Sequence, residues 1–533
     1  MLQISKFYIL ITVLALQAVR SQDVLWEKTY GGKHSEYLFD VVPAPDYGFL
    51  LAGSSLSEKN GNKAMDSEGN LDYWIWKMDE AGNLDWQKSF GGAGNDFLYK
   101  ISITKDGGLI LAGNSDSPIS GQKKIECFGQ EDYWIIKLDA NGNEEWQKTI
   151  GGTGQDILSS ICSTRDGGYL VSGSSASQSG QTKQNDDGVF FKDDVCFGNL
   201  DYFIVKLDKY GEVEWQKTVG GKYSDKLVNS LEIIDEGFLL AGYSNSPISG
   251  NKTVDTYGKN DFFLIMLDFN GNVKWQKNYG GENDEQLTSL IHSKDGNFII
   301  GGNSSSNSTG NKNSSNQNET DFWVLKINTL GDIIWQHSYD INNQDLLLSV
   351  VENEDATLLL GGYVNEQGNG KLKNKDINGY IIIKTASDGR ELWRHSVGSG
   401  GKDILRKAIE TRDGGYLLAG SSDGKISRNK KTLKGRNDFW VVKIIDRDKK
   451  PKNKAAIEAF PNPTVRFTNV VIGYEFRKGN CSVYDISGRQ LKKFEVYQNT
   501  IPVDLGGLPE GIYIIQIVTE SGTNSVKVIK THK

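Results

Sequence analysis

The chain has 533 residues, which is too long for one ordinary hydrophobic core and calls for one large repeat domain or several domains. Its 24% charged and 37% hydrophobic residues are typical of a soluble protein, and 61 glycines beside only 9 prolines favour many tight turns between strands. The formal net charge of −8 argues against a protein that binds nucleic acid, because such proteins usually present a basic face.

Residues 1–21 are predicted to be a signal peptide. Lys6 precedes an apolar run from Phe7 to Val19, and Ser21 is a small residue at the expected cleavage point. The run is too short to span a bilayer, and no later segment approaches the ~20 apolar residues that a spanning helix needs. We therefore expect an exported protein that does not span the membrane.

One phrase recurs through residues 22–445. It joins a tryptophan to a Gly-Gly pair, as in WQKSFGG from Trp86 and WQKTVGG from Trp215, and its copies begin 58 to 69 residues apart. Such a period indicates a repeat architecture. The tryptophans that we expect to dock each repeat on the next are Trp26, Trp86, Trp146, Trp215, Trp275, Trp335 and Trp393.

Each copy contains four short strand patterns. In one copy they cover 157–164, 169–175, 201–208 and 213–219, all rich in β-branched and aromatic residues and bounded by Gly, Asp or Asn. Four short antiparallel strands at this period predict one blade of a β-propeller.

The two ends of the repeat region complement each other. The last copy has strand patterns at 404–411, 415–421 and 438–445 but no tryptophan strand, whereas 24–30 is a tryptophan strand without a copy. Pairing them would complete a ring and remove exposed sheet edges. The predicted fold class is therefore all-β: a seven-bladed β-propeller with four antiparallel strands per blade, its last blade closed by the N-terminal strand.

The copies resemble the delta-60 repeats of secreted bacterial proteins. Their D-x-x-G-x-x-x-W phrase, formed in one copy by Asp139, Gly142 and Trp146, is also similar to the tryptophan-docking phrase of quinoprotein propellers. Both resemblances imply a propeller over residues 24–445 and say little about activity.

A different pattern follows the basic linker 446–455. Short alternating strands separated by turns predict a small Ig-like β-sandwich over 456–533. The segments FPNPT, VYDISGRQL, LPEGIYIIQI and SVKVIK resemble the type A C-terminal sorting domain of the type IX secretion system of Bacteroidetes. This resemblance implies recognition by the type IX export machinery, removal by a sortase-like peptidase, and a protein that is secreted or attached to the outer-membrane surface.

An acidic residue lies ten positions after each tryptophan, just before the first strand of each blade. One interpretation is a ring of carboxylates at the channel mouth that binds a cation such as Ca²⁺ or a polar ligand. The other, favoured because every copy has the acid, is that each carboxylate caps the loop of its own blade. The seven are Glu36, Asp96, Asp156, Asp225, Glu285, Asp345 and Asp403.

A second acid opens the third strand of six copies and is interpreted as a strand-end hydrogen-bonding residue. It is Asp72, Asp132, Asp201, Asp261, Asp321 or Asp438, with Gly379 in the remaining copy.

The long polar loops share one face of the predicted propeller with the Gly-Gly loops, so function is expected there. Lys123, Lys252 and Lys312 in these loops are expected to be solvated, with contact to an anionic glycan as the alternative. The longest loop, 185–198, is the candidate for an individual ligand site through Asp186, Asp187, Phe190, Phe191, Asp193 and Asp194.

Two of the four cysteines occupy equivalent loops of consecutive copies. Cys127 and Cys196 each lie five residues before an aspartate–aromatic pair. They are candidates for a disulfide if their Cα atoms lie within ~7 Å, and otherwise for two free thiols.

Catalytic motifs are missing from the sequence. The five histidines are scattered, and no H-E-x-x-H, C-x-x-C, P-loop or nucleophile elbow occurs. We expect a monomeric, secreted or cell-surface binding module for a glycan, a surface polymer or a protein, with no cofactor unless Ca²⁺ binds. The alternatives are a propeller enzyme, either a quinoprotein-type oxidoreductase or a glycan-cleaving enzyme, and a structural surface-layer component.

Overall fold

The structure is a computed structural model that describes residues 23–178, 189–316, 319–342, 344–364, 379–427, 429–449 and 456–531. All regular elements in these ranges are β-strands, which agrees with the predicted all-β class. Accordingly, no helix in this part of the chain is long and apolar enough to cross a bilayer.

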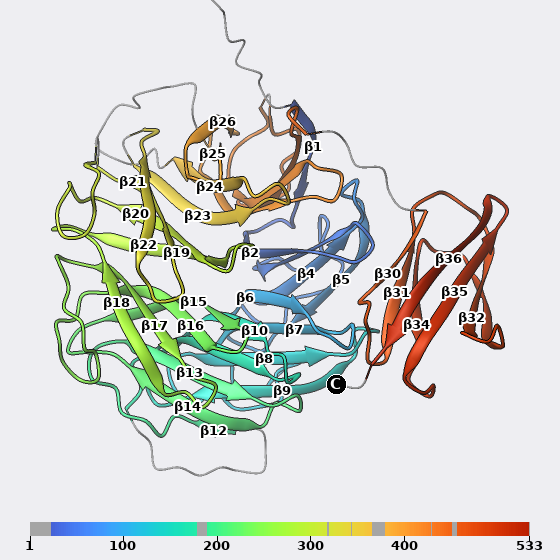
Figure 1. Ribbon diagram of the computed structural model, residues 1–533, viewed down its shortest axis with the longest axis horizontal. Coiled ribbons are helices and arrows are strands. Elements are labelled where there is room, and N and C mark those ends of the chain that lie inside the picture. Colours follow the sequence, from blue (N-terminus) through green and yellow to red (C-terminus); the bar gives the residue numbers. More distant parts are fainter. Residues whose placement is uncertain are drawn as a thin grey trace, which may run out of the picture.

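The described residues between 23 and 445 form seven sheets, each with four antiparallel strands, numbered here 1 to 7 along the chain. Figure 1 shows the first strand of each sheet nearest the centre of the repeat region. Side chains alternate along these inner strands, as in the first of them, where Glu36 and Leu38 are buried and Tyr37 is exposed. The inner strands are β2 (Glu36–Pro43), β6 (Asp96–Ile103), β10 (Asp156–Ser163), β15 (Asp225–Ile233), β19 (Glu285–His292), β23 (Asp345–Glu352) and β27 (Asp403–Glu410).

The second strand of each sheet is almost entirely buried. These strands carry small and branched residues because both of their faces are covered by neighbouring sheets, as where Leu50 and Ala52 pack with Leu109 and Trp134. The second strands are β3 (Phe49–Ser55), β7 (Leu109–Ser115), β11 (Tyr169–Ser175), β16 (Gly237–Ser244), β20 (Phe298–Ser304), β24 (Leu358–Val364) and β28 (Tyr416–Ser422).

The third strands are buried in the same way and supply the largest side chains of the core, including Trp74, Trp134, Trp323 and Trp440. They are β4 (Asp72–Met78), β8 (Asp132–Leu138), β13 (Asp201–Leu207), β17 (Asp261–Leu267), β21 (Asp321–Ile327), β25 (Tyr380–Thr385) and β29 (Asp438–Ile445).

The recurring tryptophans lie on the fourth strands, at the periphery in Figure 1. Trp146 lies against the next sheet, where a Cβ added at Gly211 (φ +83°) would come 3.1 Å from its ring. Trp26, Trp215, Trp275 and Trp335 lie against the turn glycines Gly82, Gly271, Gly331 and Gly389 in the same way. The fourth strands are β5 (Leu84–Phe90), β9 (Glu144–Gly151), β14 (Val213–Val219), β18 (Val273–Tyr279), β22 (Ile333–Tyr339), β26 (Glu391–Val397) and, in sheet 7, β1 (Asp23–Tyr30).

Sheet 7 joins the two ends of the repeat region. Its strand order is β1-β29-β28-β27, and β1 pairs antiparallel with β29 from Asp23 opposite Ile445 to Tyr30 opposite Phe439. The inner strands of successive sheets contact one another, and β27 contacts β2. The seven sheets therefore follow one another in a cycle, like the blades of a propeller.

Every inner strand carries a β-bulge at the same place. In sheet 1 Leu38 pairs with Gly53 and Asp40 with Ala52, so Phe39 between them is the extra residue. A bulge frees one side chain from the regular alternation and can re-aim it. The seven extra residues, called here the bulge ring, are Phe39, Tyr99, Ser159, Val228, Thr288, Leu348 and Arg406.

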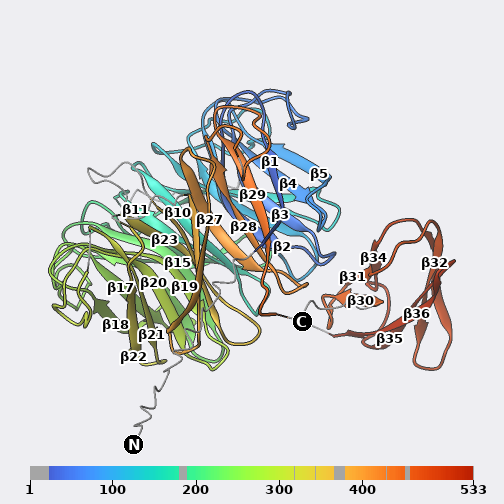
Figure 2. The ribbon, with the colours of Figure 1, turned by 90° about the horizontal axis from the view of Figure 1, so that it is seen from above.

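The C-terminal unit has two further sheets, with strand orders β30-β31-β34 and β33-β32-β35-β36. Both contribute to one core in which Cys481, Val503 and Ile515 are fully buried. Figures 1 and 2 both show this unit, in red, beside the repeat region. Its strands are β30 (Ile457–Phe460), β31 (Phe467–Ile472), β32 (Gly479–Asp485), β33 (Gln490–Val496), β34 (Thr500–Asp504), β35 (Gly511–Thr519) and β36 (Gly522–Lys530).

Candidate functional site

The seven recurring acids before the inner strands are each bonded within their own loop. In every copy the backbone N–H four residues earlier donates to the carboxylate; Gly92 N to Asp96 Oδ2, at 2.8 Å, is one example. Ser117 Oγ also donates to Asp96 Oδ2, at 2.9 Å. Because all seven side chains are at most 3% exposed, this geometry is that of loop capping. A Ca²⁺ ring formed by these acids stays a prediction.

The two sets of recurring acids meet between consecutive sheets. A Cβ added at Gly151 would lie 2.0 Å from Asp132 Oδ1 and 2.8 Å from Asp156 Oδ2, so the glycine leaves room for both carboxylates. Neither Asp132 Oδ1 nor Asp156 Oδ1 has a hydrogen-bond partner within the described residues. Burial and the neighbouring Asp132 carboxylate raise the pKa of Asp156 to about 6. Crowding of two buried carboxylates in this pair therefore favours a retained proton at mildly acidic pH.

The junction of sheets 5 and 6 has a third carboxylate. Asp340 occupies the position of the glycine that other copies place between the two acids. Ligand atoms of Asp321, Asp340 and Asp345 lie within 4.8 Å of one another. Burial and these two neighbours raise the pKa of Asp345 to about 7. Three carboxylates can coordinate Ca²⁺. A proton retained by one of them would equally relieve their mutual repulsion.

The loop lysines are inside the protein, so the expectation that they are solvated or face a glycan is wrong. Lys123, Lys252 and Lys312 are only 1–2% exposed. Their ammonium groups lie over third-strand rings; the distance from Lys123 Nζ to the Trp134 ring is 5.1 Å. Burial lowers the pKa of Lys123, and the carboxylates of Asp96 and Asp132 oppose that shift. These lysines compensate the buried acids.

The predicted disulfide between Cys127 and Cys196 is not formed, because both cysteines are free thiols. Each thiol donates to the carbonyl at the end of its own sheet's second strand: Cys127 Sγ lies 3.0 Å from Ser115 O, and Cys196 Sγ lies 2.9 Å from Ser175 O. The two side chains are thus turned into separate sheets. The two cysteines occupy equivalent positions of consecutive copies, so each has the same surroundings in its own sheet and the two do not form a bond with each other.

The long loop of the third copy is described only in part. Asp186 and Asp187, and the side chains of Phe190 and Phe191, lie outside the described residues. The backbone of β12 (Val189–Phe191) pairs parallel with β9 and makes sheet 2 five-stranded. Asp193 is exposed, and Asp194 Oδ2 accepts a hydrogen bond from Thr218 N at 2.8 Å. The described part of this loop therefore extends and caps strands.

The bulge ring holds functional candidates that the sequence analysis missed. Arg406 lies with its guanidinium 5.2 Å from the centre of the Phe39 ring, and Phe39 meets Tyr99 edge-on at 4.8 Å. All three side chains are partly exposed. The next residue on β27, Lys407, has its Nζ 2.6 Å from Asp40 Oδ1. The inner strands of sheets 7, 1 and 2 thus form an aromatic and basic sector around the centre.

A cavity of about 280 Å³ opens beside this sector, between sheets 7 and 1. Tyr37, Lys402, Arg406, Asp423 and Arg436 are among the residues that line it. The sequence analysis did not predict this cavity, because it compared the positions that the copies share. The third residue after each recurring acid differs from copy to copy, and this variation could have indicated the site.

The C-terminal unit has a regular turn that its sequence motif explains. The Asp485 carboxylate accepts hydrogen bonds from the backbone N–H groups of Ser487 and Arg489, and Gly488 adopts φ +83°. Residues 458–531 match the family described as the secretion system C-terminal sorting domain. These residues are a sorting domain. The predicted C-terminal sorting domain is thereby confirmed for this part of the chain.

Other comparisons are distant. A stretch of 160 residues is 22% identical to the regulatory protein FlaEY of Caulobacter vibrioides, covering 29% of this chain and 17% of that protein. The crystal structure of Sqt1 from Chaetomium thermophilum aligns with 80% of this chain and 99% of its own, at 12% identity and a TM-score of 0.40. BBS1N in complex with ARL6DN aligns with 81% and 99%, at 11% identity and a TM-score of 0.40. These similarities are too low to support an argument, so the fold is described from the strand pairing of this chain alone.

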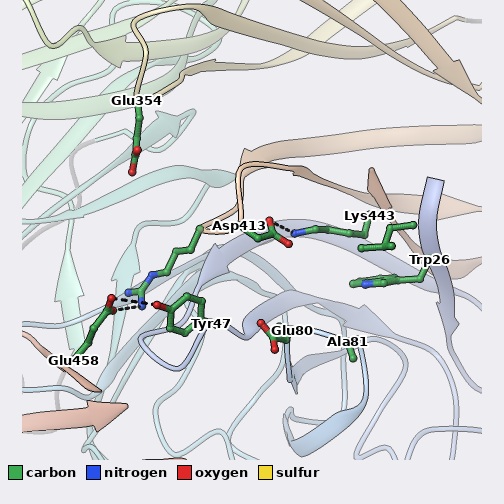
Figure 3. A pocket seen from close by; sticks show the side chains of 10 residues that line it. Trp26, Tyr47, Glu80, Ala81, Glu354, Asp413, Lys443 and Glu458 are labelled. Atoms are coloured by element: carbon green, nitrogen blue, oxygen red, sulfur yellow. Dashed lines mark hydrogen bonds and ion pairs between the residues drawn. The ribbon is translucent and has the colours of Figure 1, made fainter. Parts of the chain in front are cut away.

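The sorting domain contacts the repeat region at the short turns between inner and second strands. Glu458 accepts a hydrogen bond from Tyr47 Oη at 3.1 Å and pairs with Arg412 at 3.2 Å. Figure 3 shows Glu458 and Tyr47 at one end of a cavity of about 720 Å³ that Trp26, Glu80 and Lys443 also line. These turns lie at the opposite ends of the strands from the long loops, so the sorting domain leaves the loop face open.

Proposed function

We propose that this protein is an exported β-propeller that binds a ligand at the loop-face mouth of its central channel. In this proposal residues 22–445 are a seven-bladed propeller of delta-60-type repeats closed by β1, and residues 456–533 are an Ig-like sandwich. The pairing of β1 with β29 and the cycle of contacts among inner strands support the ring. Docking by the recurring tryptophans is supported by the contacts of five of the seven with turn glycines of the next sheet.

Export follows from the sorting domain, which supports delivery by the type IX secretion system to the cell surface or the medium. We propose further that residues 1–21 are removed as a signal peptide and that a sortase-like peptidase removes the sorting domain. The mature propeller would then act as a monomer.

The bulge ring is the observation that carries the binding function. Many core positions of each blade carry similar residues for the same packing purpose, whereas these seven inner-strand positions differ in size, polarity and charge. Residues that a repeat fold does not need for its own stability are free to serve a ligand. Their position beside a cavity on the loop face makes that ligand accessible.

The test is a binding screen with the purified full-length chain. Neutral and acidic polysaccharides, an acidic polypeptide and pyrroloquinoline quinone are titrated while thermal unfolding is followed. A polymer that raises the melting temperature, with the effect reduced by Arg406→Gln, is the expected result. A shift with pyrroloquinoline quinone alone, accompanied by substrate turnover, would instead favour the propeller enzyme.

A further inference from the structure

The cavity between sheets 7 and 1 concentrates positive charge. Three of its lining residues are cations, Lys402, Arg406 and Arg436, and Asp423 is the one carboxylate among those that line it. They come from two segments: Lys402 precedes the inner strand β27 and Arg406 is the bulge residue of that strand, whereas Arg436 precedes the third strand β29. Tertiary structure brings Arg436 to the same opening as the other two charges.

The charge belongs to this junction and is not part of the repeat. The positions that correspond to Arg406 in the other copies are uncharged: Phe39, Tyr99, Ser159, Val228, Thr288 and Leu348. Those that correspond to Lys402 are Ser35, Asn95, Gln155, Ser224, Asp284 and Gln344. Arg436 has the counterparts Asn70, Gln130, Asn199, Lys259 and Glu319. Lys259 is the single cation among these counterparts, and no other copy combines cations at the three positions, so packing of the repeat does not explain them.

Arg406 is the central residue of this cavity. Its guanidinium rests on the Phe39 ring, and no ion pair joins it to a carboxylate within the described part of the chain. Lys407, its neighbour, is by contrast paired with Asp40. A partly desolvated guanidinium without a counter-ion is unfavourable, and a bound anion would remove that penalty.

The remaining lining groups suit a sugar better than a peptide. Tyr37 is 37% exposed and offers an aromatic face with a polar tip, while Ser35, Asn437 and Asp423 offer groups that hydrogen-bond to hydroxyls. Ile404 is the sole aliphatic side chain in the lining, whereas protein interfaces are usually anchored by buried apolar groups.

Resting on the proposed binding function, the geometry points to an acidic polysaccharide as the ligand, with the carboxylate of one sugar unit bound by Arg406 and flanked by Lys402 and Arg436. The planar guanidinium fork matches a carboxylate in two parallel hydrogen bonds. A cavity of about 280 Å³ admits one sugar ring at a time, so the polymer would lie across the mouth and insert a single unit.

The experiment is a calorimetric titration of the full-length chain with oligogalacturonate and with its methyl-esterified form, which keeps the sugar rings and removes the charge. Arg406→Gln and Arg436→Gln are compared with Lys226→Gln, which removes an exposed cation from the inner strand of sheet 4. We expect Arg406→Gln to weaken oligogalacturonate binding about tenfold or more, and Lys226→Gln to change it less than about twofold. Methyl esterification should weaken binding about as much as Arg406→Gln.

Each contrary outcome has a separate meaning. Equal binding of the methyl-esterified and free forms, both weakened by Arg406→Gln, would overturn the acidic ligand and keep binding at the channel mouth. Tighter binding of polyglutamate than of oligogalacturonate would overturn the saccharide in favour of an acidic protein. Binding that neither arginine variant weakens would place the site elsewhere, and no binding in any arm of the wider screen would overturn the proposed function itself. Because the Arg436 side chain is exposed, Arg436→Gln should keep the melting temperature of the parent. A loss of binding in this variant would then not be caused by misfolding.

Discussion

Arg412 Nη1 and Glu458 Oε2 lie 3.2 Å apart and join the repeat region to the sorting domain. Arg412 also stacks on Tyr47 at 4.7 Å, and Tyr47 donates to the same carboxylate. One side chain of the sorting domain thus engages two neighbouring turns, those of sheets 7 and 1. This contact holds the sorting domain on the turn face, away from the channel mouth on the loop face.

Replacing Glu458 with Gln should loosen this contact without unfolding either part. Both partners of the ion pair are more than one third exposed, so the pair adds little stability. We expect an unchanged melting temperature but a wider distribution of distances between the two parts in small-angle X-ray scattering. The matched control is Glu495→Gln, which breaks the exposed pair with Lys478 inside the sorting domain. An unchanged scattering profile for Glu458→Gln would contradict the docking role.

Lys123→Met should destabilise the protein strongly, whereas Lys124→Met should not. Lys123 is 1% exposed and faces the buried carboxylates of Asp96 and Asp132, so its removal leaves buried negative charge uncompensated. The expected loss is about 3 kcal/mol of unfolding free energy. Lys124 is largely exposed and pairs with Glu144 at the surface, which predicts a loss below about 1 kcal/mol. Urea denaturation of both variants measures the difference, and similar losses would refute the compensating role.

The carboxylate pairs predict that stability falls as pH rises from about 4 to 7. Burial and the neighbouring Glu285 raise the pKa of Asp261 to about 7, and burial and Asp225 raise the pKa of Asp201 to about 6. A raised pKa means that the folded protein binds more protons than the unfolded chain between the unfolded value of about 3.9 and these values. The corresponding stability is present below this window and is lost as pH passes through it.

Asp261→Asn should flatten this pH dependence, because an amide cannot ionise. At pH 8 the variant should be more stable than the parent by roughly 1 kcal/mol, and at pH 5 nearly equal to it. Asp139→Asn is the control: hydrogen bonds from Asn143 and Asn141 outweigh slight desolvation and lower the pKa of Asp139, so this exposed carboxyl is ionised throughout. Chemical denaturation between pH 5 and 8 checks the result. The same slope in Asp261→Asn and the parent would rule out this pair as the cause.

Asp340→Asn should raise the unfolding free energy at pH 8 by roughly 1 kcal/mol, since it removes one of three carboxylates that crowd within 4.8 Å. Asp388→Asn, in a neighbouring surface turn, should change it by less than about 0.5 kcal/mol. Melting temperatures with EDTA and with millimolar Ca²⁺ check this prediction. A variant that is less stable than the parent only when Ca²⁺ is present would show that a cation occupies the group.

The sequence by itself determined the blades. Strand alternation, turn glycines and a tryptophan at each period are local features, so they predict the four strands of a sheet and the unpaired β1 that the structure places beside β29. The sorting-domain motifs were equally readable, because turn residues such as Asp485 and Gly488 act on neighbours a few positions away.

Tertiary structure decided the environment of the loop and bulge side chains. Lys123 looks like any loop lysine in the sequence and is buried because its loop folds back over two acids, Asp96 and Asp132, that open different strands of one sheet. Cys127 and Cys196 share a pattern, but each thiol points into its own sheet. Arg406, Lys402 and Arg436 are separated along the chain by other residues and share a cavity only where sheet 7 meets sheet 1. The repeat period and the strand propensity of the residues are local properties of the sequence. Charge compensation and cavity lining depend on contacts between segments that are distant in sequence, and these contacts form only in the folded protein.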